Sequence, residues 1–220
     1  MKRIEAIAAP VREQTVAIVR EAIISGQLVP GQRLIEKDLC DSLGVSRGSV
    51  REALRQLEAE QLIHTVPNKG PIVAKLTPRD ILDICQVRSA LESMAVRLFV
   101  ENATEEHIAR LEAGVEEIDR AFVAGDLNLT VRAKSAFFQT FYEGSGNALI
   151  STLLRSLDAR INLVRRLVFV SGESSGGIGQ FRALVDALKR RDAKSAAVIC
   201  EELLDAAVEV ATKMIEEGEV

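Results

Sequence analysis

Apolar residues recur at every third or fourth position over most of this chain, which is the spacing of helices that bury one face. In the stretch TVAIVREAIISG, Val16, Val19 and Ile23 fall on one face of such a helix. Gly26 follows, where a glycine commonly ends a helix. The pattern therefore predicts a first amphipathic helix that stops at this glycine.

Two further short helices are predicted after a turn at Pro30-Gly31. The stretch IEKDLCDSLG predicts a helix with Leu39 and Leu43 turned inward, and Gly44 ends it. Ser46 is placed to cap the next helix, in the stretch GVSRGSVREALRQLEAE. The apolar residues of that helix are Val50, Leu54 and Leu57. Two short helices joined by a tight turn form a helix-turn-helix.

Beyond this pair, the segments LIHTV and PIVAKL predict two strands on either side of the turn PNKG. The expected hairpin has Lys69 and Gly70 at its tip. Three helices followed by a two-stranded hairpin form a winged helix-turn-helix, with the hairpin as the wing.

A stripe of arginines lies beside the apolar face of the second motif helix, at Arg47, Arg51 and Arg55. An isolated stripe of this kind is typical of a solvated helix. In a helix-turn-helix, however, the N-terminal residues of the second helix enter the DNA major groove. Arg47 and Arg51 are therefore placed to reach phosphates and guanine edges, whereas Arg55 reaches phosphate or solvent. Ser46 and the first backbone amides can hold a phosphate.

From residue 77 onward the helical pattern continues and no strand pattern is found. Thr77, Pro78 and Asp80 have the spacing of a helix start with a capping box. Further helices are predicted at 104–124, 127–143, 147–170, 178–191 and 193–216. We therefore expect an all-α bundle of about six helices over residues 77–220, after a winged helix-turn-helix domain over residues 1–76. The glycine-rich stretch SGESSGG matches no phosphate-binding loop and predicts a flexible connector.

Charge divides along the same line. Over residues 1–75 basic residues outnumber acidic ones by two, whereas over residues 76–220 acidic residues exceed basic ones by six. A basic N-terminal part followed by an acidic C-terminal part fits a nucleic-acid-binding module fused to a second domain.

Cysteine usage and hydropathy indicate the compartment. Cys40, Cys85 and Cys200 are far apart and lie in apolar helical patterns, so we expect buried free thiols in a reducing environment. No zinc-ligand spacing occurs. The start MKRIEAIAAPVREQ lacks the apolar core of a signal peptide, and no apolar run is long enough to span a membrane. We expect a cytoplasmic protein without membrane association.

The stretch GQLVPGQRLIEKDLCDSLGVSRGSVREALRQLEAEQLI, followed by PNKGPIVAKL, resembles the N-terminal domain of GntR-family transcriptional regulators. Their pattern runs G-x-L-x-P-G-x-x-L and then L-G-V-S-R-x-x-V-R-E-A-L-x-x-L, and the resemblance covers roughly residues 11–76. It implies DNA contacts at Lys37, Ser46, Arg47, Gly48, Ser49, Arg51, Lys69 and Gly70. Many members have Thr or Ala and Pro where this chain has Gly48 and Ser49, so its base preference need not follow theirs.

The segments VRSALESMAVRL, FFQTFYEGSGNALI and QFRALVDALKRRDAKSAA resemble the C-terminal domain of the FadR branch of these regulators, the FCD type. This resemblance implies a helical bundle around an effector cavity, and a homodimer. Metal-dependent members hold their metal with an Asp and three His. The matching positions here are Lys134, Phe138, Phe181 and Leu203, none of which is an ordinary metal ligand. We therefore expect neither a metal nor another cofactor.

Two basic residues are predicted inside the bundle. Arg88 lies in the middle of an apolar stripe and needs a partner. Either Glu92, one turn on, forms a structural pair with it, or Arg88 anchors an acidic ligand. Lys134, near several phenylalanines, either extends to solvent or anchors an anion in place of the metal. The candidate effector-binding residues are Arg88, Lys134, Phe138 and Phe181.

These observations predict a dimeric transcription regulator, a repressor, that binds a short palindromic operator in double-stranded DNA. Its helical domain would bind a small-molecule effector, such as an organic acid, without a metal. The alternative is a regulator whose cavity has been filled and whose helical domain only dimerises. An enzyme is disfavoured because no nucleophile with a base, metal cluster or cofactor motif occurs.

Overall fold

The computed structural model describes residues 8–172 and 177–218, and the chain divides into two compact units between Lys75 and Leu76. Most of the predicted connector SGESSGG, residues 173–176, lies outside the described residues. So do residues 1–7, on which part of the signal-peptide prediction rests.

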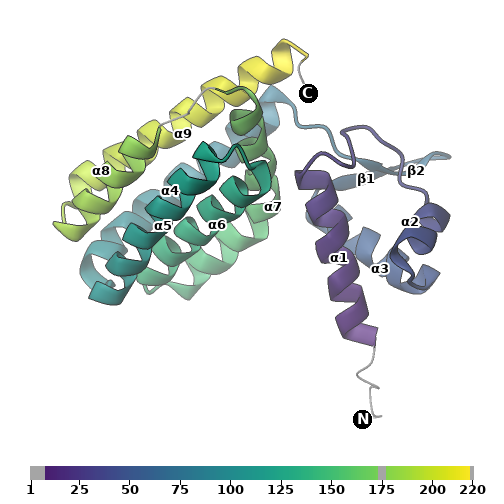
Figure 1. Ribbon diagram of the computed structural model, residues 1–220, viewed down its shortest axis with the longest axis horizontal. Coiled ribbons are helices and arrows are strands. Elements are labelled where there is room, and N and C mark those ends of the chain that lie inside the picture. The colour runs from purple at the N-terminus through teal and green to yellow at the C-terminus, as the bar shows by residue number, and fades with distance from the viewer. Residues whose placement is uncertain (1–7, 173–176, 219–220) are drawn as a thin grey trace. The chain divides into compact units, whose positions relative to one another are not determined.

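The described part of the first unit has three helices and a hairpin (Figure 1). These elements are α1 (Ala8–Ile24), α2 (Glu36–Leu43), α3 (Arg47–Ala59), β1 (Ile63–Val66) and β2 (Gly70–Val73). The strands are antiparallel, with Ile63 opposite Val73 and Val66 opposite Gly70. The predicted winged helix-turn-helix is confirmed.

Local sequence sets the geometry of the motif. Gly44 ends α2 in the left-handed conformation, with φ of 65°, and donates its backbone N–H to the Cys40 carbonyl. Ser46 then caps α3 by accepting a hydrogen bond from the backbone of Ser49 at 3.2 Å. Because one residue separates the two caps, α3 starts at a fixed position relative to α2.

The core of this unit lies between α1 and the apolar face of α3. Its fully buried side chains include Val16, Val19, Ile23, Leu34, Val50, Ala53, Leu57, Leu62, Ile63 and Val73. The prediction that Leu39 and Leu43 turn inward is only partly correct, because both are half-buried. Cys40 is also half-buried, contrary to the prediction, whereas Cys85 and Cys200 are buried free thiols. Helix α2 is short and contacts mainly α3, so it cannot bury a complete face.

The second unit is a bundle of six helices within the described residues (Figure 1). They are α4 (Pro78–Asn102), α5 (Glu105–Val123), α6 (Leu127–Gly144), α7 (Ala148–Val170), α8 (Ile178–Lys189) and α9 (Ala193–Glu216). Helix α4 packs on α9, α5 on α6, α6 on α7 and α8 on α9. The all-α bundle predicted from periodicity is confirmed.

Two sets of contacts hold the start of α4 in place. Thr77 and Asp80 form the predicted capping box. The Asp80 carboxylate also accepts a hydrogen bond from Arg160 of α7 at 2.8 Å. The first turn after the connection from the first unit is therefore tied to α7.

Within the described residues, two apolar clusters fill the bundle. The larger surrounds Phe99, Phe137 and Phe141 and includes residues from α4, α5, α6, α7, α8 and α9. Gly144 lies against the Phe99 ring so closely that a Cβ atom there would overlap it. The smaller cluster joins α4, α7 and α9 around Ile81 and Ile161. The bundle also buries polar side chains, including Arg88, Glu92, Asn162 and Arg165.

Candidate DNA interface and helical-domain cavity

The first turns of α3 present an exposed basic surface. Ser46, Arg47, Gly48 and Arg51 are exposed, and Ser49 is half-buried. Among the described residues, none forms a hydrogen bond or ion pair with the Arg47 guanidinium, which is therefore available to a phosphate or a base. Without a side chain, Gly48 leaves the backbone here open to close approach.

The other two arginines of the stripe have carboxylate partners. Arg51 Nε lies 2.9 and 3.1 Å from the two oxygens of Glu36, the first residue of α2. Arg55 donates to Glu52 on its own helix at 2.7 Å. The stripe predicted as one face thus has one unpaired arginine at its start and two paired ones beyond it.

The remaining predicted DNA contacts lie on α2 and the hairpin. Lys37 is exposed in the first turn of α2, next to Glu36, which pairs with Arg51 of α3. Lys69 is exposed at the hairpin turn, and Gly70 adopts φ of 83° there. A glycine meets this backbone requirement without strain.

In the helical unit, a cavity of about 40 Å³ lies among α4, α6, α7, α8 and α9. Its lining comprises Arg88, Glu92, Lys134, Phe138, Val164, Arg165, Val168, Phe181, Leu203, Leu204 and Ala207. The structure therefore brings together all four candidate effector-binding residues from three different helices. Leu203, matched to the last metal position, lines the same cavity.

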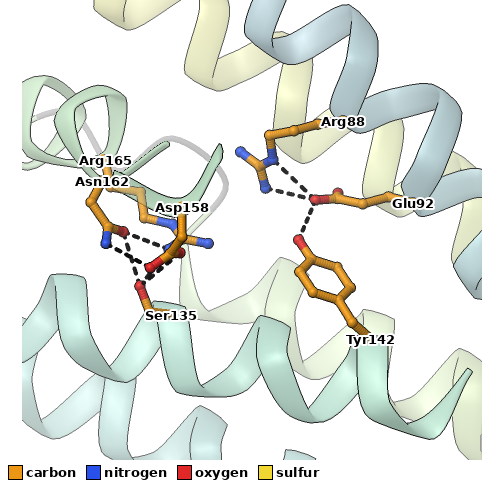
Figure 2. A network of polar contacts seen from close by, with 7 residues as sticks. All are labelled: Arg88, Glu92, Ser135, Tyr142, Asp158, Asn162 and Arg165. Atoms are coloured by element: carbon orange, nitrogen blue, oxygen red, sulfur yellow. Dashed lines mark hydrogen bonds and ion pairs between the residues drawn. The ribbon is translucent and has the colours of Figure 1, made fainter. Parts of the chain in front are cut away.

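Arg88 and Glu92 form the buried ion pair that was one of the two alternatives for Arg88. Arg88 Nε and Nη2 each lie 3.0 Å from Glu92 Oε1. Tyr142 donates its hydroxyl to the same oxygen at 2.6 Å (Figure 2). Burial acts to lower the pKa of Arg88, but the Glu92 carboxylate outweighs it and the pKa is raised. Burial, reinforced by Glu92, raises the pKa of Tyr142. This network is charge-balanced.

Arg165 is a second buried arginine at the cavity, and sequence reasoning missed it. Its Nη1 donates to Asn162 at 2.7 Å and Ser135 at 2.8 Å, and lies 3.5 Å from Asp158, as Figure 2 shows. The closest hydrogen-bond acceptors of Arg165 are thus neutral oxygens. The carboxylate near it, Asp158, is farther away and has a side chain that is 44% exposed. Burial, with the nearby charge of Arg88, lowers the pKa of Arg165.

Lys134 is half-buried and faces the same cavity. Its Nζ lies 5.6 Å from the centroid of the Phe181 ring, and no described carboxylate pairs with it. Burial, followed by the charges of Arg165 and Arg88, lowers the pKa of Lys134 to about 8. Near neutral pH the amine is therefore still mostly protonated.

Phe138 contacts both guanidinium groups of the cavity. Its ring centroid lies 5.2 Å from Arg88 Cζ and 5.1 Å from Arg165 Cζ, within the range of a cation–π interaction. Three cations therefore surround the cavity, against one fully buried carboxylate, Glu92, and the partly exposed Asp158. The lining has a surplus of positive charge.

Within the described residues, no group of three or more His, Cys, Asp or Glu side chains could hold a metal ion. In the same residues, no helix is long and apolar enough to cross a membrane.

A winged helix-turn-helix with an exposed basic second motif helix, joined to a helical bundle, is the architecture of DNA-binding transcription regulators. Comparison with known proteins supports this class. Residues 11–73 match "Bacterial regulatory proteins, gntR family", and residues 83–206 match the FCD domain. The chain belongs to the GntR family of bacterial transcription regulators, with an FCD-type C-terminal domain.

Individual relatives agree. The HTH-type transcriptional regulator McbR of Escherichia coli (strain K12) is 30% identical over 170 residues, covering 76% of this chain and 77% of that protein. An uncharacterized HTH-type regulator of Bacillus subtilis (strain 168), YdhC, is 29% identical over 180 residues, covering 81% of this chain and 80% of that protein. The solved structure of E. coli McbR/YncC superposes with a TM-score of 0.81 at 25% identity, over 93% of this chain and 98% of that one.

Proposed function

We propose that this protein is a homodimeric repressor that binds a short palindromic operator in cytoplasmic DNA and is released by a small organic anion. Residues 1–76 act as the DNA-binding domain, and residues 77–220 bind the effector and form the dimer. The observation that supports the effector most directly is the surplus positive charge around the cavity.

The N-terminal end of α3 enters the major groove of the DNA, where Arg47 and Arg51 contact base edges and phosphates. Ser46, Gly48 and Ser49 allow the backbone amides of α3 to approach a phosphate. Lys37 and the wing tip at Lys69 and Gly70 contact the flanking backbone. Two identical DNA-binding domains related by a two-fold axis require two half-sites in inverted orientation.

The effector's anionic group binds Lys134 and Arg165. Arg88 is less available than the sequence indicated, because Glu92 already neutralises it at 3.0 Å. Lys134 has no described carboxylate partner, and Arg165 is bound mainly by neutral oxygens. An entering carboxylate supplies the charge that these two groups lack, and the rings of Phe138 and Phe181 contact the apolar part of the molecule.

The size of the cavity connects binding with a change of shape. About 40 Å³ holds one or a few waters, whereas ligand pockets usually measure about 300–1,000 Å³. An organic acid therefore enters only if the surrounding helices repack. Because it binds the repacked state better, the ligand shifts the population toward that state. The changed spacing of the two DNA-binding domains then prevents simultaneous contact with both half-sites. The affinity of the dimer for its operator therefore falls.

The same small volume favours a second candidate, a regulator whose cavity is filled. Phe138 and Phe181 are both buried, and their rings make an edge contact with centroids 6.1 Å apart. In this case the two rings belong to the core, and repression depends on the amount of protein or on another protein.

A ligand screen separates the two candidates. Small organic acids, sugar acids and acyl-CoAs are tested by thermal shift, and hits are tested for release of a selected operator by fluorescence anisotropy. We expect hits to lose their effect in Lys134→Met but to keep it in Lys194→Met, which removes the same charge from an exposed position of α9. If no acid stabilises the protein, the filled-cavity regulator is the better description.

The oligomer is tested separately. We expect a dimer at micromolar concentration in sedimentation equilibrium and a footprint with two symmetric half-sites. A monomer, or a footprint of one half-site, would contradict the proposed mode of binding.

A further inference from the structure

The carboxylate of Glu36 holds Arg51 by one edge of its guanidinium group. Both short contacts, at 2.9 and 3.1 Å, are made by Nε, and no described acceptor binds the two terminal nitrogens. An arginine side chain carries five N–H donors, and the four on the terminal nitrogens have no described acceptor. The forked end that can pair with O6 and N7 of guanine is thus left free.

The position of Glu36 is fixed by the backbone. It is the first residue of α2, its side chain is 35% exposed, and α2 packs on α3. The Arg51 side chain, 59% exposed, belongs to the second turn of α3. The ion pair therefore bridges the two helices of the motif at the surface that carries the predicted DNA contacts.

The pair has two opposite consequences for DNA binding. It limits the orientations of the Arg51 side chain before binding, so less conformational freedom is lost when a base is contacted. It also places a negative charge near the phosphates, which weakens binding to any DNA sequence. Exposed ion pairs of this kind contribute little to stability, so the effect on the fold is small.

We propose that Glu36 is a specificity-determining residue that positions Arg51 for end-on contact with a base and disfavours its contact with phosphate. Arg47, which has no such partner, remains free to adapt to either. The proposal rests on the proposed DNA interface, because it requires Arg51 to contact a base.

The test uses the full-length protein and an operator obtained by in vitro selection with wild type. Fluorescence anisotropy gives the affinity for that operator, for operators with single base changes and for an unrelated duplex. Glu36→Ala should reduce discrimination at one base pair of each half-site by about two- to fivefold, because an exposed ion pair can orient Arg51 by no more than its own small free energy. Its affinity for the unrelated duplex should rise about two- to threefold, because one negative charge is removed.

Glu52→Ala is the matched control, since it removes the same charge from α3 itself and frees Arg55. It should raise affinity for the unrelated duplex similarly and leave discrimination at that base pair unchanged. In an Arg51→Ala background, Glu36→Ala should have no further effect on discrimination.

The outcomes are distinguishable. If Arg51→Ala abolishes discrimination at a base pair and Glu36→Ala leaves it intact, the role of Glu36 is overturned and the DNA interface stands. Equal loss of discrimination in Glu36→Ala and Glu52→Ala would also overturn it, since charge alone would then be responsible. If Arg51→Ala changes nothing, both the inference and the assignment of Arg51 fail.

Discussion

Replacing the cavity lysine by methionine should stabilise the protein at neutral pH. Methionine has a similar length and no charge, so Lys134→Met removes a partly buried cation that two arginines repel. A pKa lowered from 10.5 to about 8 corresponds to at most roughly 3 kcal/mol of destabilisation. Because Lys134 as a whole residue is only half-buried, solvent screening reduces this, and we expect a gain of about 1–2 kcal/mol.

The sign of the pH dependence follows from proton binding. Between pH 8 and 10.5 the unfolded chain binds a proton at this lysine that the folded protein does not, so wild-type stability rises through this range. Below pH 8 the amine is protonated in both states, and the full penalty applies. The advantage of Lys134→Met is therefore greatest below pH 8 and disappears as the pH approaches 10.5.

Urea unfolding at several pH values from 6.5 to 10, followed by circular dichroism, measures this difference between variant and wild type. Lys194→Met, exposed on α9, should show a small difference without this dependence. An advantage of Lys134→Met that does not change with pH would indicate packing and not charge. A loss of stability at neutral pH would refute the surplus of positive charge in the cavity.

Three further predictions concern other parts of the molecule. Arg47→Ala and Arg51→Ala should each weaken binding to the selected operator by about 1–3 kcal/mol in anisotropy, with unchanged circular dichroism; unaltered affinity in both would contradict the recognition-helix assignment. Gly144→Ala should lower the free energy of unfolding by about 1–3 kcal/mol in urea titration, because its methyl group overlaps the Phe99 ring; a neutral effect would mean that α4 and α6 separate easily. Treatment with a chelator should change neither the melting temperature nor operator affinity, whereas one equivalent of tightly held zinc in elemental analysis would show that a metal site exists.

The elements of this fold were predictable because their boundaries are encoded locally. Thr77, Pro78 and Asp80 specify the start of α4 within four residues, and the capping box forms as predicted. Gly44 and Ser46 do the same for the turn of the motif. The position of α2 against its neighbours was harder, since two leucines at helical spacing do not show how much of a partner surface exists. That is why Leu39 and Leu43 are less buried than expected.

The cavity shows where sequence reasoning stops. Arg88 stood out because it interrupts a regular apolar stripe. Arg165 was missed because Arg166 follows it, and the pattern alone does not show which of two adjacent arginines turns inward. Its partner Ser135 is thirty residues away on α6, so the contact depends on how α6 and α7 pack. The choice between Lys134 at solvent and Lys134 in the cavity depended on the same packing.

Helix α7 connects the hydrogen bond between Arg160 and Asp80 with the cavity. Arg160 holds the first turn of α4, which continues directly from the DNA-binding unit, whereas Arg165 on the same helix lines the cavity. Five residues of helix separate them, about 7.5 Å along the axis. The proposed effector, if it turned α7 at the cavity, would therefore also shift the residue that is bonded to the first turn of α4.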